Sequence, residues 1–591
     1  MIMVKPVILA IAVLLCLGST QVFAKRGGKV EICHEPPGNP ANYRTKKVGK
    51  RALKAHLAHG DSRGSCNEVY PENVDLQILA INDFHGNIAT SSGSFGGTGR
   101  ADYLAANIQA AEAGVDNSVF VSVGDLFGAS PLISSLFHDE PTIEAMNLSG
   151  LDINAVGHHE FDEGVAELLR MQNGGPHPID GDLDGDPFAG ADFEFLAANV
   201  VVDASGETLF PAFSVRNFQG IEVAFIGLTL EGVPTVVAPD KIDGLSFLDE
   251  ADTVNGLVSE LQQGGIEAIV VLLHEGGQSD GGANDCGSGL TGPIAEIVPL
   301  LSDAVDLVIT GHSNDEFVCE LDGKWVTMAD NRGRLFTDID VTLNRTTRDM
   351  TIATISNLAN LQSGVPDPSV TALIDKYSNL SVPLANAVTG AVTSDILRSN
   401  NTAGESALGD VIADAQLSAT AGAELGNAEI AFMNPGGIRS DLLFVSSGPE
   451  SDSEVTIAEI FTVQPFGNSL VTMDLTGAQI DALLEQQWAG QPFRRILQVS
   501  EGFTYEWSDS AIDGDRVDPA SIRLNGAPVD PLATYRVVVN SFLAAGGDNF
   551  SILTEGTNRL GGAQDFDALK AYFEANSPVM PGPQDRITSL P

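Results

Sequence analysis

Two adjacent histidines and two carboxylates lie within the short stretch 157–162, GHHEFD. The stretch follows residues 153–156, an apolar run typical of a short buried strand. Burying imidazoles and carboxylates without partners costs free energy, so groups placed there need something to pair with. A metal ion would pair with them, whereas an isolated His-His pair more often lies on a surface loop. The metal interpretation therefore depends on what the other strand ends carry.

Other predicted strands in the first half of the chain also end in metal-ligand side chains. Because the carboxyl ends of strands in an open α/β sheet face one crevice, these side chains are expected to meet. A mixture of aspartate, histidine and asparagine suits divalent transition metals better than magnesium. One histidine at a strand end is more often structural, but five on four strand ends indicate a metal centre. The residues are Asp83 and His85 after 76–82, Asp125 after 119–123, His158 and His159 after 153–156, His274 after 268–273, and His312 and Asn314 after 305–310.

Helical patterns alternate with these strand-like runs, which predicts a layered α/β domain. Helices are expected at 101–113 and 251–264, and further strands at 195–201, at 222–228 and within 324–357. A connecting helix at 366–377 and a loop at 381–383 would end this domain. A second α/β pattern follows, with a helix at 407–421, strands at 428–433 and 535–540, and Gly-rich turns at 434–439 and 545–548.

The chain begins with the pattern of a secretory signal. Lys5 precedes an apolar run at 7–17 that is too short to span a bilayer, and Ala24 is a small residue at the expected cleavage point. No later run is long and apolar enough to span a membrane, so a secreted protein, periplasmic or extracellular, is expected. The predicted parts are a signal peptide (1–24), a small basic Cys/His module (25–70), a first α/β domain (71–362), a linker helix (363–385) and a second α/β domain (386–591).

Four cysteines remain once the signal is removed. An even number in an exported protein suggests two disulfides. Sequence order favours Cys33–Cys66 and Cys286–Cys319 among the three possible pairings.

The basic module contrasts with an acidic body. Residues 25–70 contain 10 Lys+Arg and 4 Asp+Glu, whereas the whole chain has a formal net charge of -48. Such acidity disfavours nucleic-acid binding through a basic surface of the body. The module also holds His34, His56 and His59, the last two at i,i+3 spacing on a short helix expected at 49–59. A disulfide-stapled module and a small zinc site are both compatible with this pattern, and an oxidising compartment favours the disulfide.

The acidic segment 180–186, DGDLDGD, resembles the start of a calcium-binding loop. It lacks the closing bidentate glutamate, which favours a solvated acidic turn over a calcium site.

The motifs around the predicted metal centre resemble those of the calcineurin-like metallophosphoesterases. They are Asp-x-His at 83–85, Gly-Asp at 124–125, Gly-x-His-Glu-Phe-Asp at 157–162, and Gly-His-Ser-x at 311–314. The sequence is most similar to the two-domain 5'-nucleotidase family, which includes UDP-sugar hydrolases and cyclic-nucleotide phosphodiesterases. The resemblance covers most of residues 74–585. It implies a layered αββα sandwich followed by a C-terminal α/β substrate-binding domain.

The resemblance also implies two divalent metal ions, zinc, manganese or cobalt. Asp83, His85 and Asn314 would hold one ion, His274 and His312 the other, and Asp125 would bridge both. Asn314 stands where the family usually has glutamine. His158 stands where the family usually has an asparagine ligand, and imidazole is also a competent ligand.

The remaining polar residues of the 157–162 stretch match the catalytic pair of the family. His159 would stabilise the transition state or protonate the leaving oxygen while the metal pair activates a water. Asp162 would fix the tautomer of His159.

Substrate specificity would come from the C-terminal domain. By resemblance, Arg439 would bind phosphate or carboxylate, Phe466 and Phe542 would sandwich a nucleobase, and Asp548 would lie near the ribose hydroxyls, with Asn434 in the same loop as Arg439. Two departures from the family weaken the predicted phosphate-binding site. The helix 407–421 carries no arginine, and Pro435 replaces a usual glycine.

The leading hypothesis is a secreted, metal-dependent phosphoric monoester hydrolase of the 5'-nucleotidase type that acts in nucleotide catabolism. A UDP-sugar hydrolase or a 2',3'-cyclic-nucleotide 2'-phosphodiesterase uses the same centre. A sulfur-oxidation relative of the fold would need no nucleobase platform, so the phenylalanine pair argues against it. The alternative from another class is a surface-binding protein with a decayed centre, against which the intact ligand set argues.

Overall fold

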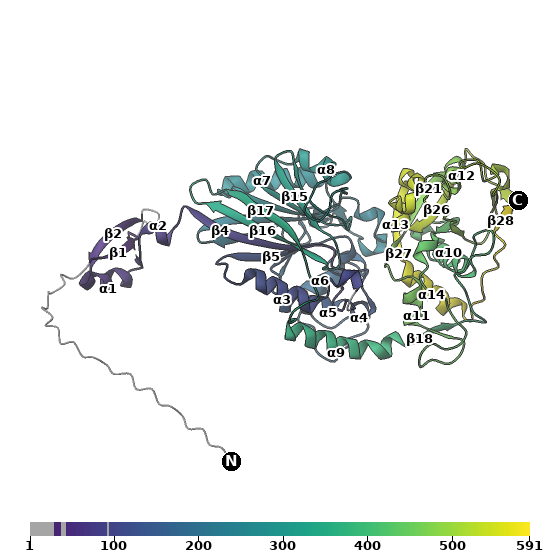
Figure 1. Cartoon of the computed structure of the whole chain (residues 1–591), viewed down its shortest axis with the longest axis horizontal. Helices are drawn as coiled ribbons and strands as arrows, with labels where there is room; N and C mark the ends of the chain where they lie inside the picture. Colours follow the sequence, from purple (N-terminus) through teal and green to yellow (C-terminus); the bar gives the residue numbers. More distant parts are fainter. Residues whose placement is uncertain (1–28, 37–42, 92–93) are drawn as a thin grey trace, which may run out of the picture. The chain divides into compact units, whose positions relative to one another are not determined.

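The structure is a computed structural model that describes residues 29–36, 43–91 and 94–591. The chain forms two compact units, the first ending at Glu72 and the second spanning Asn73–Pro591 (Figure 1). The predicted signal peptide lies outside the described residues. Within the described part, no helix is both long enough and apolar enough to cross a membrane.

The small N-terminal unit is a three-stranded sheet with two short helices. The strands pair in the order β2-β1-β3, antiparallel throughout. Ile32, Leu53 and the disulfide Cys33–Cys66 form its buried centre, which confirms the first predicted pairing. Its elements are β1 (Lys29–His34), β2 (Arg44–Gly49), α1 (Lys50–Ala58), β3 (Ser62–Arg63) and α2 (Cys66–Val69).

The first half of the large unit contains two six-stranded sheets. The first has the order β17-β16-β4-β5-β6-β7, and the second has the order β14-β15-β13-β12-β10-β9. In the first, β4, β5, β6 and β7 run parallel, and in the second so do β10, β12, β13 and β15. The strands are β4 (Asn73–Ile81), β5 (Ser118–Val123), β6 (Ile153–Ala155), β7 (Glu194–Leu196), β9 (Phe213–Phe218), β10 (Ile221–Thr229), β12 (Ala268–His274), β13 (Leu307–Thr310), β14 (Glu316–Leu321), β15 (Lys324–Ala329), β16 (Leu335–Asn344) and β17 (Met350–Ala359).

The two sheets pack face to face, and helices cover their outer faces. Ile78 and Val121 of the first sheet share a buried cluster with Val270 and Ile309 of the second. Helices α3 and α5 lie on one outer side, and α7 and α8 lie on the other (Figure 1). This confirms the predicted αββα sandwich. The helices are α3 (Ala101–Glu112), α4 (Leu132–Ser135), α5 (Glu140–Ser149), α6 (Val165–Asn173), α7 (Glu250–Gly264) and α8 (Pro293–Ile297).

The second half of the large unit is built on a five-stranded sheet, with the order β22-β19-β26-β21-β27. Leu408 and Ile412 of α10 share one buried cluster with Phe573 of α14. Ile480 of α12 belongs to a second buried cluster in this half of the unit. The predicted C-terminal α/β domain is therefore confirmed. Its main elements are β18 (Val388–Ala391), α10 (Ala407–Thr420), β19 (Ile430–Met433), β20 (Glu454–Thr456), α11 (Ile457–Val463), β21 (Ser469–Thr476), α12 (Gly477–Glu485), β22 (Gln498–Val499), β23 (Phe503–Ser508), β24 (Arg523–Leu524), β25 (Ala527–Pro528), β26 (Thr534–Asn540), α13 (Ser541–Ala544), β27 (Thr557–Gln564), α14 (Asp565–Asn576) and β28 (Ile587–Leu590).

Two local predictions are wrong. The strand predicted at 195–201 is interrupted, because buried Asn199 donates to the carbonyls of Thr229 and Leu248 and so ends β7 before β8 (Val200–Val202) begins beside β11 (Leu245–Phe247). The loop predicted at 381–383 is helical. Helix α9 (Pro368–Ala385) continues past Pro383, since backbone N–H groups of the following residues bond to carbonyls of its last turn.

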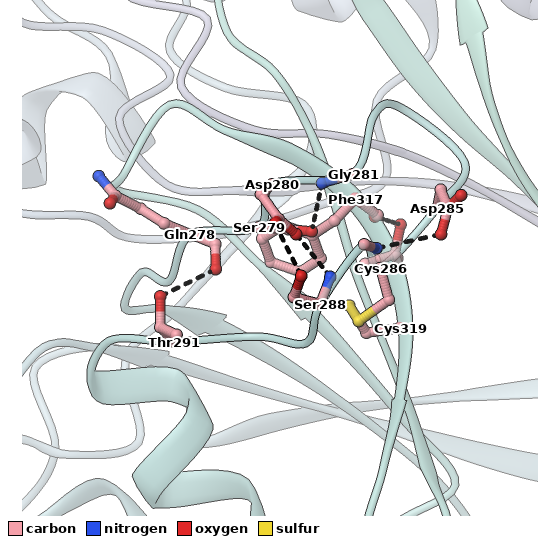
Figure 2. Close-up of a disulfide and its surroundings, with 12 residues drawn as sticks. Gln278, Ser279, Asp280, Gly281, Asp285, Cys286, Ser288, Thr291, Phe317 and Cys319 are labelled. Carbon is pink, nitrogen blue, oxygen red and sulfur yellow. Dashed lines mark hydrogen bonds between the residues drawn. A yellow bond between two sulfur atoms is a disulfide. The ribbon is translucent and has the colours of Figure 1, made fainter.

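The second disulfide, Cys286–Cys319, also matches the predicted pairing. It links β14 to the loop that follows β12 (Figure 2). The same loop is closed by backbone hydrogen bonds between Gln278 and Thr291, and Asp280 accepts hydrogen bonds from Ser288. The segment directly after His274 is therefore anchored on both sides.

Candidate metal centre

The strand ends of both sheets meet as predicted. Ligand atoms of Asp125, His158, His274 and His312 lie within 4.8 Å of one another, and those of His85, Asp125 and His159 form a second such group. Asp125 belongs to both groups. The expected crevice lies between two sheets, because these side chains come from β4, β5 and β6 of one sheet and from β12 and β13 of the other.

Asp125 lies at the middle of the cluster. Its Oδ2 is 3.1 Å from His274 Nε2, 3.2 Å from His158 Nδ1 and 4.0 Å from His85 Nε2. His85 Nε2 also lies 4.0 Å from Asp83 Oδ1, the second carboxylate of the cluster. Both carboxylates are buried, at 0% and 1% exposure for Asp83 and Asp125, so charged groups must offset their charge.

Hydrogen bonds outside the cluster orient two of its imidazoles. His274 Nδ1 donates to the carbonyl of Val123 at 2.7 Å, and His85 Nδ1 donates to the carbonyl of Gly128 at 3.0 Å. A carbonyl can only accept, so Nδ1 of each ring carries a proton and Nε2 is the atom that faces the carboxylates of the cluster. Metal-binding histidines are held in this way.

Glu160 organises the loops and was not assigned a role from the sequence. Its buried carboxylate accepts hydrogen bonds from the backbone N–H groups of Asp125 (2.9 Å), Leu126 (2.8 Å) and Gly157 (2.7 Å). It therefore clamps the loops after β5 and β6 together. Its position inside the GHHEFD stretch was the available signal.

The backbone is left-handed at five of the predicted ligands. The angle φ is +49° at Asp83, +48° at His85, +47° at Asp125, +74° at His312 and +56° at Asn314. This conformation is uncommon for residues other than glycine, and it concentrates at functional sites.

The protonation states of the cluster suit cation binding. Burial lowers the pKa of His85 to about 3 and that of His312 to about 4, and burial holds the pKa of His158 well below its usual range. His274 differs: burial opposes its protonation, but Asp125 raises its pKa to about 10, so a bound cation would have to displace that proton. Burial also raises the pKa of Asp83 to about 7. Neutral imidazole is the form that binds metals. Burial opposes ionisation of Asp125, but His158 and His274 outweigh it and hold the pKa of Asp125 well below its usual range.

One imidazole nitrogen of the cluster, Nδ1 of His312, has no hydrogen-bonding partner among the described residues. A buried imidazole nitrogen without a partner is costly unless something else binds it. Together with the neutral imidazoles of His85 and His158 and the ionised Asp125, this atom fits a donor set built for divalent transition metals.

His159 and Asp162 form the predicted pair. His159 Nδ1 lies 2.7 Å from Asp162 Oδ2, and the backbone N–H of His159 donates to Asp125 Oδ1 at 3.0 Å. Burial opposes protonation of His159, but Asp162 and Asp125 raise its pKa to about 9. The imidazole therefore carries a proton near neutral pH.

A residue of the C-terminal domain reaches this pair. Gln564, at the end of β27, donates through Nε2 to Asp162 Oδ2 at 2.5 Å. The sequence offered no signal for this contact, because 402 positions separate the two residues.

Asn314 is the predicted ligand whose hydrogen bonds lead away from the cluster. Its amide nitrogen donates to the carbonyl of His312 at 3.1 Å, and its amide oxygen accepts from Asn331 at 2.8 Å. The side chain is exposed.

The predicted substrate residues form two groups in the C-terminal domain. Asn434 Nδ2 donates to Asp548 Oδ2 at 2.9 Å, and Asn434 is itself held by Asn540. The guanidinium carbon of Arg439 lies 5.6 Å from the ring centroid of Phe466. Phe466 and Phe542 are exposed at 37% and 45%, which is unusual for core phenylalanines and suits a stacking platform.

Two arginines near these groups were missed. Arg398 Nη1 donates to the carbonyl of Ile438 at 3.2 Å, and Arg495 Nε lies 3.4 Å from Asp548 Oδ1. They supply positive charge that helix 407–421 lacks. The run Phe493-Arg494-Arg495 was the signal for the second.

The acidic segment 180–186 is tied to helix α9. Asp184 Oδ2 accepts from Lys376 Nζ at 2.5 Å and from the hydroxyl of Tyr377 at 2.9 Å. The ammonium group of Lys376 neutralises part of the carboxylate charge that a calcium ion would require. The contact therefore favours the acidic-turn interpretation of 180–186 over a calcium site.

Comparison with known proteins gives matches over most of the chain. The family "calcineurin-like phosphoesterase" matches residues 76–315, and "5'-nucleotidase, C-terminal domain" matches residues 384–555. Endonuclease YhcR of Bacillus subtilis is 32% identical over 562 residues, covering 93% of this chain and 44% of that protein. Cell wall protein Lmo0130 of Listeria monocytogenes is 33% identical over 521 residues, covering 83% of this chain and 65% of that protein. The chain thus spans less than two thirds of either relative.

A solved structure shares the arrangement. The 5'-nucleotidase precursor from Thermus thermophilus superposes with a TM-score of 0.51 at 25% sequence identity. The match covers 87% of this chain and 99% of that chain, so it includes both halves of the large unit.

Proposed function

The chain belongs to the metallophosphoesterases that carry a 5'-nucleotidase C-terminal domain, and from this premise we propose that it is an exported phosphoester hydrolase releasing phosphate from nucleotides. The observation that carries the proposal is the convergence of imidazoles from both sheets on the buried Asp125. Neither a structural core nor a decayed centre needs this donor set. We propose nucleoside monophosphates as its substrates.

Two divalent cations would occupy the centre. Asp83 and His85 would hold one, His158, His274 and His312 the other, and Asp125 would contact both. Asn314 joins the first group only if its side chain leaves Asn331. When bound, such cations activate a water molecule and neutralise charge on phosphoryl oxygens.

His159 would act on the leaving group. Its Nδ1 is engaged by Asp162, so its Nε2 is the atom available to a substrate. With a pKa of about 9 the ring holds a proton at neutral pH and can give it to the departing oxygen.

The C-terminal residues would select a nucleotide. Exposed Phe466 and Phe542 offer aromatic faces to a base, and Arg439 beside Phe466 offers a cation to an anionic group. The Asn434–Asp548 pair presents an amide and a carboxylate suited to ribose hydroxyls. Export is supported by the signal pattern of residues 1–24 and by two disulfides.

The test is a substrate panel with the metal-loaded protein. AMP, UDP-glucose, 2',3'-cyclic AMP, bis-p-nitrophenyl phosphate and a single-stranded oligonucleotide separate the possible ester classes; the oligonucleotide is included because one relative is named an endonuclease. We expect AMP to give the highest kcat/KM, and the matched variant Asp125→Asn to be inactive on every substrate. An absence of hydrolysis with zinc, manganese and cobalt would favour the surface-binding alternative instead.

A further inference from the structure

The small N-terminal unit contains a second cluster of metal-ligand side chains. Ligand atoms of His34, His56, His59 and Asp61 all lie within 4.8 Å of one another. Asp61 Oδ2 is 2.8 Å from His34 Nδ1 and 2.6 Å from His56 Nδ1, and Asp61 Oδ1 is 3.3 Å from His59 Nδ1. This cluster belongs to the first compact unit and shares no residue with the centre around Asp125.

The fold of the unit brings the four residues together from different elements. His34 is the last residue of β1, His56 lies in the final turn of α1, and His59 caps that helix. Gly60 has φ +106°, a conformation that lets the chain reverse directly between His59 and Asp61. The disulfide from Cys33, next to His34, ties the end of β1 to the start of α2.

The rings are arranged around a point and do not stack. The three pairs of imidazoles have centroids 5.1–5.7 Å apart and interplanar angles of 62°, 83° and 86°. By contrast, His138 and His177 stack at 3.7 Å and 16°. Edges that converge at steep angles are what ligands around one small cation need, because each nitrogen lone pair lies in the plane of its ring.

The carboxylate is enclosed by these rings. The Asp61 side chain has no exposed surface, whereas those of His34, His56 and His59 are 13%, 23% and 38% exposed. One further donor reaches it, the backbone N–H of Glu35 at 3.2 Å. The cluster is therefore open to solvent on its histidine side only, which gives a cation a path of entry.

We propose that His34, His56, His59 and Asp61 form a binding site for one divalent transition-metal ion, with zinc as the best fit. Three imidazole nitrogens and one carboxylate oxygen complete a tetrahedral shell, in which Zn–N bonds of about 2.0 Å place neighbouring ligand atoms about 3.3 Å apart. Four protein ligands leave no open position, so the site is structural. It holds the end of β1 against the end of α1.

The absence of thiolate ligands among these four has a chemical reason. Both cysteines of the unit are joined in a disulfide, so they cannot bind zinc, and a disulfide is stable where thiolates would be oxidised. A site of histidine and aspartate keeps its affinity under the same conditions. The disulfide and the zinc site are thus complementary features of one unit.

The metal content of the full-length mature protein tests the proposal. Wild type, His34→Ala/His56→Ala, Asp61→Asn and Lys54→Ala are equilibrated with zinc, desalted and measured by elemental analysis. Lys54 lies exposed on the same helix and serves as the matched control. We expect the double variant and Asp61→Asn each to lose one zinc per chain relative to Lys54→Ala, with unchanged AMP hydrolysis.

A spectroscopic measurement separates this site from the centre around Asp125. In an Asp125→Ala/His274→Ala background, Co²⁺ should give the absorption of a tetrahedral site, and Asp61→Asn should abolish it. A thiol assay checks that Cys33–Cys66 is intact; if the double variant exposes free thiols, the isosteric Asp61→Asn decides the result. A zinc content equal to that of Lys54→Ala, or an unaltered Co²⁺ spectrum, would overturn the proposal and leave a hydrogen-bonded histidine cluster.

Discussion

Replacing His159 by alanine should remove catalysis while leaving the metal centre loaded. The backbone N–H of residue 159, which donates to Asp125 Oδ1 at 3.0 Å, persists in the variant. None of the orienting bonds of His85 or His274 involves the side chain of His159. Both ions should therefore remain, and elemental analysis of wild type and variant should agree.

The size of the rate loss follows from the role of the proton. General acid catalysis contributes about 10²- to 10⁴-fold, equivalent to about 3–5 kcal/mol of activation free energy. The loss should depend on the leaving group. The ribose oxygen of AMP needs a proton to depart, whereas p-nitrophenolate does not. We expect kcat for AMP to fall by about 10³-fold, and kcat for p-nitrophenyl phosphate to fall much less.

The pH dependence provides a second readout. The pKa of His159 is raised to about 9, so the acid form is present below that value and disappears above it. Wild-type turnover of AMP should decline above about pH 9, and Asp162→Asn, which removes the charge that raises this pKa, should shift the decline to lower pH. Metal loss from His159→Ala, or equal losses with both substrates, would refute the reasoning.

Three further perturbations follow from individual contacts. His158→Asn should keep the metal stoichiometry but bind zinc less tightly relative to manganese in a competition measured by elemental analysis, because imidazole favours zinc; unchanged selectivity would mean that His158 does not bind the metal. Gln564→Leu should lower kcat about tenfold without metal loss, since a hydrogen bond to a charged carboxylate is worth about 1.5 kcal/mol; wild-type kcat would show that the contact with Asp162 is dispensable. Burial, aided by Asp349, raises the pKa of Asp306 to about 8, so its folded-state stability is present at low pH and is lost as pH rises through 8. Asp306→Asn should therefore raise the free energy of unfolding relative to wild type at pH 9 but not at pH 4, measured by denaturant titration, and a pH-independent difference would contradict this.

The metal centre could be predicted from the sequence because the rule behind it is local. A strand followed by Asp-x-His or Gly-Asp marks a carboxyl end, and the carboxyl ends of parallel strands face one crevice. Contacts between distant segments follow no such rule. The bond from Gln564 to Asp162 leaves no pattern, since it joins segments 402 positions apart, and Glu160 stands inside the GHHEFD stretch without any sign that it would reach the loop after β5.

The N-terminal unit shows a different limit of sequence analysis. The i,i+3 spacing of His56 and His59 was visible, and so was the pair Cys33–Cys66. The favoured disulfide is present, and it does not exclude the metal site proposed above, because the cross-link beside His34 helps to bring His34 to Asp61. Asp61 itself carries no signal, being one aspartate after one glycine.

The left-handed backbone of the centre bears on whether an imidazole at residue 158 can serve as a metal ligand. A left-handed backbone at a residue other than glycine raises the conformational free energy of the folded chain by about 1 kcal/mol or more. Asp83, His85 and Asp125 all adopt this conformation. The fold holds them there: the N–H of Asp83 donates to the carbonyl of Gly124, the N–H of His85 donates to the carbonyl of Asp125, and Glu160 clamps the next loop. The ligand positions are therefore set by the backbone and not by the ion. A centre that is organised in this way can accept imidazole in place of an amide at residue 158, because the exchange alters one donor atom and leaves the frame of the others unchanged.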